Sequence, residues 1–270
     1  MRVLLTNDDG IGATGLQSLR RALVGLDDLE VVTIAPDSNR SATARSITTR
    51  SPLAVEEITF EDGNVGFAID GTPVDCVRFA ELGLGGGRPD LIVSGINHGV
   101  NLGDDITYSG TVAAALEGII LGIPAIALSQ QRSGGDMGYG GGSFDFAVAA
   151  EFSARLVDHL RGEAMPEATL ININFPGGEP TGVEVTKLGK RIYDDEMRLL
   201  DKTDDRGRQI YEIYGRAPGH EELEGTDLSA VAAGRIAVTP IHFDLTDHGG
   251  LDTLRGWGLE EMLGTQTPAA

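Results

Sequence analysis

Cysteine is almost absent from this chain of 270 residues, and the sequence contains no long apolar run. Its one cysteine, Cys76, excludes a framework of intrachain disulfides and any zinc site rich in cysteine. The apolar stretches are much shorter than a membrane-spanning helix, and the opening residues lack the apolar segment of a signal peptide. We therefore expect a cytoplasmic protein that does not enter a membrane.

Positive charge is also scarce, because 21 Lys and Arg residues stand against 41 Asp and Glu residues. Duplex nucleic acid is bound through a basic face, so the net charge of −20 argues against such a partner. An anionic substrate would need a metal ion or local arginines to reverse the field at its site. The five histidines show no H-x-x-x-H spacing, which gives a zinc site little support.

Strand and helix patterns alternate along the chain. Apolar runs over 3–6 and 30–36 predict buried strands, and leucines at helical spacing predict a helix over 16–26 between them. Such a repeat implies a parallel sheet with helical crossovers, so the predicted fold is α/β, with a Rossmann-like, mostly parallel sheet flanked by helices. Further strands are predicted over 53–60, 66–70, 90–97, 123–129, 169–175, 182–188 and 235–245, and further helices over 71–82, 111–122 and 144–161.

The segment 189–225 differs from the rest of the chain because it is strongly charged. Residues 201–209, DKTDDRGRQ, predict a turn between strand-like pieces that carry tyrosines, Tyr214 among them. We expect an arm that projects from the domain and serves contacts between subunits. The predicted division is a catalytic core over 1–188 and an arm with the C-terminal segment over 189–270.

Two adjacent carboxylates, Asp8 and Asp9, follow the first predicted strand. Polar residues also follow two other strands, at 38–41 and 94–97, and ligands of an open α/β sheet bind outside the carboxyl ends of its strands. The three clusters should therefore converge, and their oxygen ligands favour Mg²⁺, Mn²⁺ or Ca²⁺. Both aspartates can reach one ion only if the strand has already ended, and Gly10 permits the turn.

A second motif competes for the same region. Residues 10–15, GIGATG, match the G-x-G-x-x-G pattern of dinucleotide-binding proteins and lie between a strand and a helix. Asp37 stands near the position expected for a ribose-binding acid, so a dinucleotide-dependent oxidoreductase is the alternative prediction. Asp8 and Asp9 oppose it, because they would repel a pyrophosphate seated on that loop.

The stretch 94–118, SGINHGVNLGDDITYSGTVAAALEG, supplies further polar residues. Ser109, Gly110 and Thr111 stand where a helix is predicted to begin, and the free N–H groups and dipole of a helix start favour an anion. The loop is not a Walker A motif, because G-K-[ST] is absent. A phosphate bound there, beside a metal held by the paired aspartates, is an arrangement for phosphoryl transfer or hydrolysis.

Several of these residues also have a plainer interpretation. Ser109 could simply cap its helix, and Asn97 and Asn101 could be left-handed turn residues in a glycine-rich loop. Arg40 and Arg45 could add cationic contacts to a phosphate, and the plainer interpretation of Arg45 and Arg50 is a solvated surface.

The segments LLTNDDG, APDSNRSA, GTPVDCV and the stretch 94–118 resemble the survival protein E (SurE) family, and the similarity extends to LININFP and VTPIHFDLT. Members are metal-dependent nucleotidases that hydrolyse nucleoside monophosphates. The resemblance implies a Rossmann-like N-terminal domain and a C-terminal extension that is exchanged or intertwined between subunits. A homodimer or homotetramer is therefore expected.

The resemblance also implies the members of the site. It places the metal ligands on Asp8, Asp9, Ser41 and Asn97, and the phosphate contacts on Asn39, Ser109, Gly110 and Thr111. The implied cofactor is one divalent ion per subunit, Mg²⁺ or Mn²⁺. Thr14 stands where many relatives have proline, and the position of His98 varies, so the resemblance gives His98 no role.

The prediction is a divalent-metal-dependent phosphomonoesterase that converts nucleoside monophosphates to nucleoside and phosphate. The predicted enzyme is a 5'-nucleotidase that could also hydrolyse 3'-nucleotides and short polyphosphates. The ion would polarise the phosphate and position water for in-line attack, and Asp8 or Asp9 could act as general base. A non-catalytic nucleotide-binding or assembly protein and the GIGATG oxidoreductase are the competing hypotheses, and in both Asp8 and Asp9 would form only a turn.

Overall fold

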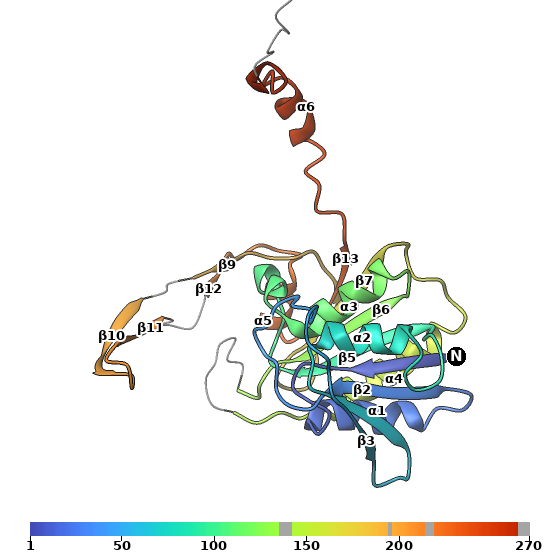
Figure 1. Cartoon of the computed structure of the whole chain (residues 1–270). Helices are drawn as coiled ribbons and strands as arrows, with labels where there is room; N and C mark the ends of the chain where they lie inside the picture. Colours follow the sequence, from blue (N-terminus) through green and yellow to red (C-terminus); the bar gives the residue numbers. More distant parts are fainter. Residues whose placement is uncertain (135–141, 194–195, 214–218, 264–270) are drawn as a thin grey trace, which may run out of the picture.

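The computed structural model describes residues 1–134, 142–193, 196–213 and 219–263. Within these residues, nine strands form one sheet in the order β3-β4-β2-β1-β5-β6-β7-β13-β8 (Figure 1). The strands are β1 (Arg2–Thr6), β2 (Glu30–Pro36), β3 (Val55–Thr59), β4 (Val65–Ile69), β5 (Leu91–His98), β6 (Ala125–Gln130), β7 (Thr169–Phe175), β8 (Val183–Val185) and β13 (Ile236–His242).

The central strands of this sheet are parallel. β1 lies between β2 and β5, and β6 and β7 continue the parallel sheet beyond β5. The antiparallel pairs are β3 with β4 near one edge and β7 with β13 near the other. The predicted mostly parallel α/β fold is confirmed. Because the chain proceeds to β2 on one side of β1 and to β5 on the other, the sheet has a topological switch point between β1 and β5.

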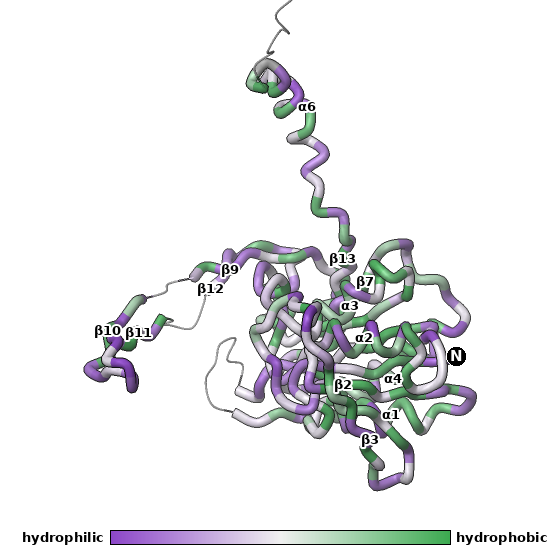
Figure 2. Tube along the Cα trace, in the orientation of Figure 1, coloured by the Kyte–Doolittle hydropathy of each residue, from purple (hydrophilic) through white to green (hydrophobic). Residues whose placement is uncertain are grey.

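Helices cover both faces of the sheet (Figure 1). α1 (Thr14–Val24) and α4 (Ala147–His159) pack on one face, and α2 (Pro73–Glu81) and α3 (Gly110–Ile120) pack on the other. Leu4 and Leu5 are both fully buried but belong to different apolar clusters, because successive residues of a strand point to opposite faces. Figure 2 shows the apolar stretches of these elements gathered in the body of the molecule.

The starts of two helices show how local chemistry sets their bounds. Thr72 caps α2: its hydroxyl accepts from the Asp75 N–H at 3.2 Å, and the Asp75 carboxylate accepts from the Thr72 N–H at 2.9 Å. α4 begins at Ala147 and not at 144 as predicted. Asp145 accepts from the Ala147 N–H at 3.0 Å, which holds the preceding residues in a turn.

The charged segment projects from the body as predicted (Figure 1). β9 (Arg191–Ile192) pairs with β12 (Gly219–His220), and beyond them β10 (Met197–Thr203) pairs with β11 (Gln209–Ile213). The predicted turn includes Gly207, whose φ of +76° suits glycine. Tyr214 lies outside the described residues. We call the described part of 189–225 the arm.

The last part of the chain returns to the sheet. α5 (Asp227–Ala232) packs near β13, and β13 lies between β7 and β8. The sheet therefore includes a strand from beyond residue 188, and the predicted division between 1–188 and 189–270 does not coincide with its edge. After β13 the chain leaves the body towards α6 (Gly250–Arg255) and a short turn, η2 (Glu261–Leu263) (Figure 1). No helix in the described residues is both long and apolar enough to span a bilayer.

Candidate active site

The two adjacent carboxylates lie in a turn, as expected. β1 ends at Thr6, and the Asn7 side chain closes the turn by donating to the Gly10 carbonyl at 2.9 Å and accepting from the Gly10 N–H at 3.2 Å. Gly10 has φ of +104°, a conformation that side chains disfavour. Because the strand has ended, Asp8 and Asp9 no longer point to opposite faces, and both line one cavity.

This cavity has a volume of about 530 Å³ and lies at the carboxyl ends of the central strands. Six residues predicted from the sequence line it: Asp8, Asp9, Asn39, Ser41, Asn97 and Ser109. They come from the segments after β1 and β2, from the end of β5 and from the start of α3. The predicted convergence at one edge of the sheet is therefore confirmed.

Asp8 is the most buried carboxylate of the cavity, with 3% of its surface exposed. Burial raises the pKa of the Asp8 carboxyl to about 6, and the neighbouring charge of Asp9 also raises it. Hydrogen bonds from Thr111 counteract this effect: the hydroxyl donates to Oδ1 at 2.6 Å and the N–H donates to Oδ2 at 3.2 Å. These donors to the Asp8 carboxylate carry no positive charge, so its charge is poorly compensated within the described chain.

Two predicted phosphate contacts have a different place in the structure. Gly110 and Thr111 do not line the cavity but lie directly behind Asp8. A Cβ at Gly110 would lie 2.8 Å from the Asp8 Cβ and Oδ2, so glycine is needed for the close approach of the carboxylate. At the start of α3, Thr111 therefore binds the Asp8 carboxylate and Gly110 leaves room for it.

Asp9 is held from two sides. Its Oδ2 accepts from the His98 N–H at 3.0 Å and lies 3.0 Å from the His98 Nδ1, and its Oδ1 accepts from the Asn39 amide at 3.4 Å. The Asn39 Oδ1 in turn accepts from the Ser41 N–H at 2.8 Å. This Asx turn places Ser41 at the cavity together with Asn39.

Asn97 reaches the cavity from the end of β5. The register with β6 shifts between Ser94 and Asn97, and an irregularity of this kind changes the direction of side chains. A Cβ at Gly95 would lie 2.4 Å from the Leu128 carbonyl oxygen, so the close strand approach here requires glycine. The Asn97 amide donates to the Gly99 carbonyl at 2.9 Å, which leaves Oδ1 as a ligand atom.

Asn97 and Asn101 do not have left-handed backbone conformations, so that interpretation is wrong for both. Asn101 is buried because it belongs to a hydrogen-bond network under the cavity. Its N–H donates to the Asn174 Oδ1 at 2.8 Å, and its side chain donates to the Ser129 hydroxyl at 2.7 Å. Its carbonyl accepts from the amides of Asn172 and Asn174, at 2.9 and 3.0 Å. The alternation of asparagines in LININF was the sequence signal for this network.

The arm forms part of the cavity wall, which was not predicted from the sequence. Arg191, from β9, lines the cavity with a side chain that is 1% exposed. Its Nε donates to the Asp105 Oδ2 at 2.7 Å, and the Tyr193 hydroxyl donates to the Asp105 Oδ1 at 2.5 Å. Arg132 lines the cavity as well. The arm is therefore part of the site.

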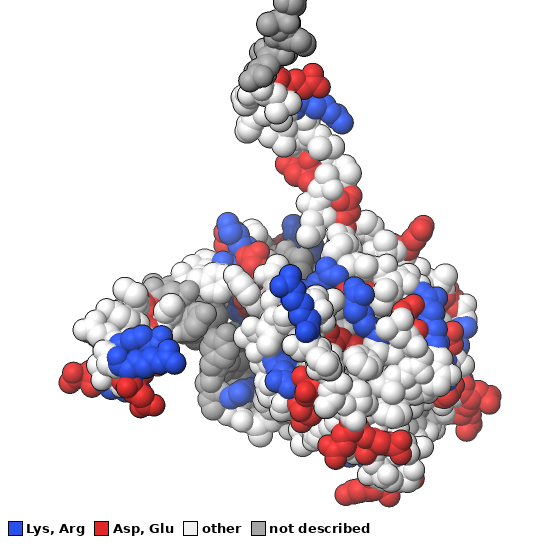
Figure 3. Space-filling view, viewed as in Figure 1, with Lys and Arg blue, Asp and Glu red and all other residues white. Residues whose placement is uncertain are grey.

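The arginines considered from the sequence are engaged elsewhere. Arg40 pairs with Asp37 at 2.9 Å, and Arg45 pairs with the buried Glu117 at 2.6 Å. Neither residue lines the cavity. On the face in Figure 3, acidic and basic side chains are interspersed and do not form a continuous basic surface.

The donor set fits a hard divalent cation. The described residues contain no group of three or more His, Cys, Asp or Glu side chains suited to a metal. Among the residues that line the cavity are the carboxylates of Asp8 and Asp9, the Asn97 amide and the Ser41 hydroxyl, and Mg²⁺ or Mn²⁺ accepts such oxygen ligands. A cation here would compensate the buried charge of Asp8.

Two glycines of the GIGATG motif are required by the packing of the fold. A Cβ at Gly15 would lie 2.0 Å from the Ile96 carbonyl oxygen, so this glycine allows α1 to approach β5. Gly10 closes the turn that carries the aspartates. The close packing and the turn therefore explain both glycines, and neither requires a bound dinucleotide.

Fold and site together define an α/β protein with an acidic, oxygen-lined cavity at the switch point of its sheet. Residues 3–195 match the family described as Survival protein SurE. The chain is 50% identical to the 5'-nucleotidase SurE of Rubrobacter xylanophilus, over 97% of this chain and 99% of that relative. It is 45% identical to the 5'-nucleotidase SurE of Geobacter metallireducens, again over 97% and 99%.

A solved structure also has a fold similar to that of this chain. The SurE protein from Aquifex aeolicus superposes with a TM-score of 0.77 at 38% identity, covering 96% of this chain and 100% of that one. The chain belongs to the SurE family. The resemblance found in the sequence is confirmed, and the comparisons give the oxidoreductase alternative no support.

Proposed function

We propose that this protein is a metal-dependent nucleotidase that hydrolyses nucleoside monophosphates to nucleoside and phosphate. The observation that carries the proposal is the pair of carboxylates, Asp8 and Asp9, at the floor of an oxygen-lined cavity. The relatives named 5'-nucleotidase SurE, at 50% and 45% identity over nearly the whole chain, support the same activity.

We propose Asp8, Asp9, Ser41 and Asn97 as the residues that hold one divalent ion, Mg²⁺ or Mn²⁺. When bound, the ion supplies Lewis acidity toward the phosphate and neutralises charge that develops on it. Asp8 and Asp9 are the proposed catalytic carboxylates, and one of them accepts the proton of the attacking water. Asp8 is suited to a fixed geometry, because Thr111 binds both of its oxygens.

The phosphate contacts in this proposal are Ser109 and Asn39. Ser109 caps α3, since its Oγ accepts from the Val112 N–H at 3.1 Å, and its hydroxyl proton stays available to a phosphate oxygen. Capping and phosphate binding are therefore compatible. Donors aimed at the phosphate oxygens stabilise the charge of the transition state. Gly110 and Thr111, at the same helix start, complete the proposed phosphate side, and Thr111 also binds Asp8.

The finer properties also belong to the proposal. We propose activity on 3'-nucleotides and short polyphosphates in addition to 5'-nucleotides, and a cytoplasmic location. We also propose a homodimer or homotetramer in which 189–270 is exchanged or intertwined between subunits. Large apolar side chains exposed on the arm and the C-terminal segment, such as Met197 at 72% and Leu245 at 86%, support contacts with another subunit.

The test is phosphate release from nucleoside monophosphates in three steps: as purified, after EDTA, and after Mn²⁺ or Mg²⁺ is restored. We expect release to stop with EDTA, to return with metal, and to be lost in Asp9→Asn, which keeps the shape of the side chain. Asp27→Asn is the matched control, because Asp27 is exposed in the segment between α1 and β2. Release that ignores EDTA would contradict the metal, and nucleotide binding without release would favour a non-catalytic binding protein.

A further inference from the structure

His98 contacts one of the proposed metal ligands through both its backbone and its ring. It is the last residue of β5, and its N–H donates to the Asp9 Oδ2 at 3.0 Å. The ring nitrogen Nδ1 lies 3.0 Å from the same oxygen. The backbone N–H and the ring of one residue therefore both lie against one oxygen of the carboxylate.

The other ring nitrogen of His98 is also occupied. Nε2 lies 2.9 Å from the Thr14 hydroxyl, at the first residue of α1. Thr14 and Asp9 therefore lie against the two opposite nitrogens of one imidazole ring.

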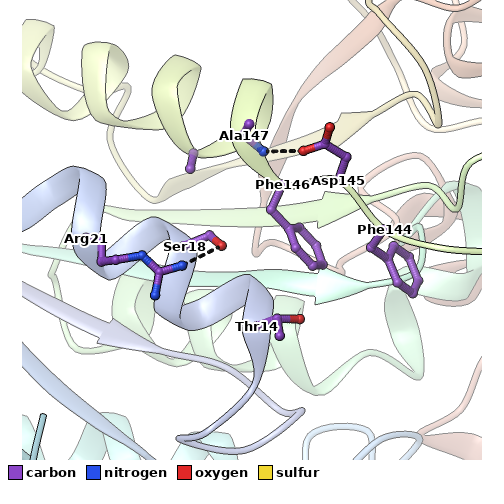
Figure 4. Close-up of a pocket in the computed structure, with 8 residues that line it drawn as sticks. Thr14, Ser18, Arg21, Phe144, Asp145, Phe146 and Ala147 are labelled. Atoms are coloured by element: carbon purple, nitrogen blue, oxygen red, sulfur yellow. Dashed lines mark hydrogen bonds between the residues drawn. The ribbon is translucent and has the colours of Figure 1, made fainter. Parts of the chain in front are cut away.

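Aromatic rings restrict the rotation of the imidazole. Phe144 and Phe146 stack with their ring centroids 5.5 Å apart and their planes inclined by 11°. His98 meets both at a steep angle, with centroid distances of 5.1 Å to Phe144 and 5.0 Å to Phe146. Figure 4 shows Thr14 on α1 facing the two phenyl rings, which precede α4, across a second cavity. The ring is thus held by one hydrogen bond with Thr14, a close contact with Asp9 and two aromatic contacts.

We propose that His98 is a positioning residue for Asp9, with Thr14 as the group that holds the imidazole ring in place through Nε2. This inference rests on the proposed metal-dependent function. Because the His98 N–H and ring both lie against Oδ2, Oδ1 is the oxygen that Asp9 presents to the divalent ion, and it accepts a long hydrogen bond of 3.4 Å from the Asn39 amide. Without the ring, the repulsion between Asp8 and Asp9 would favour rotation of the Asp9 carboxylate away from the site.

The expected loss of metal affinity can be taken from comparable arrangements in other metal sites. Loss of a group that orients a metal ligand lowers metal affinity by about 10- to 100-fold. The same loss leaves the ligand itself in place, so binding weakens without disappearing. Thr14 acts one contact further away, and its removal should have a smaller effect of roughly 3- to 10-fold.

The experiment titrates the metal-free full-length protein with Mn²⁺ and follows free Mn²⁺ by electron paramagnetic resonance. His98→Ala should weaken binding by about 10- to 100-fold, whereas His98→Asn, whose amide can place a donor near the Asp9 Oδ2, should stay within roughly threefold of the wild type. Thr14→Val is the intermediate case.

The outcomes separate this inference from the proposed function. Wild-type protein that binds Mn²⁺ together with unchanged affinity in His98→Ala would overturn the positioning role alone. Equal weakening in His98→Ala and His98→Asn, with lower melting temperatures in both, would show a structural role and overturn it as well. Wild-type protein that binds no Mn²⁺ would overturn the proposed metal site and this inference with it.

Discussion

Replacing Asp8 with asparagine should stabilise the metal-free protein. Asp8 is nearly fully buried, and burial, its largest cause, raises the pKa of its carboxyl from 3.8 to about 6. The charged form is therefore unfavourable in the folded state when no metal is present. An asparagine at this position would remove that charge and keep the shape of the side chain, although it cannot bind a cation as well.

The size of the effect follows from the pKa. A folded pKa about 2.2 above the unfolded one lowers the free energy of unfolding by about 3 kcal/mol at pH 8. Asparagine loses one acceptor toward the Thr111 N–H, at a cost of about 1 kcal/mol. Asp8→Asn should therefore be more stable than the wild type by about 2 kcal/mol at pH 8.

The raised pKa of Asp8 also predicts the direction in which the free energy of unfolding changes with pH. Because the folded pKa is higher, the folded wild type binds more protons than the unfolded chain between about pH 4 and 6. The free energy of unfolding therefore falls as the pH rises through this window. Asp8→Asn lacks this contribution, so the difference between variant and wild type should be smaller at pH 5 than at pH 8 by about 1.4 kcal/mol.

The assay is urea unfolding by circular dichroism, in EDTA, at pH 5 and pH 8. Asp27→Asn is the control for the loss of one exposed carboxylate, and its difference from the wild type should stay within about 0.5 kcal/mol at both values. A difference between Asp8→Asn and wild type that does not change with pH would refute the reasoning. So would an Asp8→Asn protein that is less stable at pH 8.

Two further substitutions test the surroundings of the site. Gly110→Ala places a Cβ 2.8 Å from the Asp8 Oδ2, so we expect a loss of about 1–3 kcal/mol in urea unfolding and strongly reduced phosphate release. Wild-type release would contradict the close packing of helix and carboxylate. Arg78→Leu leaves the Glu117 carboxylate, 1% exposed, with one arginine in place of two, which should lower the unfolding free energy by about 1–3 kcal/mol. An unchanged urea midpoint would mean that Arg45 compensates the buried charge alone.

The succession of strands and helices along the chain could be predicted, because capping residues and the spacing of apolar residues indicate the same elements. The strand over 30–36 is as predicted, and the Thr72–Pro73 helix start follows from capping chemistry. The place of β13 could not be predicted, because an apolar run does not say with which strand it pairs. Its pairing with β7 and β8 makes the sheet include residues from beyond 188.

The site was predictable as far as it follows from strand ends. The carboxyl ends of β1, β2 and β5 bring Asp8, Asn39 and Asn97 together, which the general geometry of α/β sheets implies. The hydrogen-bond partners were not predictable in this way. Thr111 binds Asp8 from the start of α3, and Arg191 lines the cavity from β9 of the arm.

The central claim is that Asp8 and Asp9 exist to hold a divalent cation. The most direct measurement is the anomalous diffraction of manganese in crystals of the wild type grown with Mn²⁺, compared with Asp9→Asn. We expect one manganese peak per chain, roughly 2.0–2.6 Å from oxygens of Asp8, Asp9 and Asn97, and a weak or missing peak in the variant. A peak of equal height in Asp9→Asn, or manganese bound only elsewhere, would contradict it.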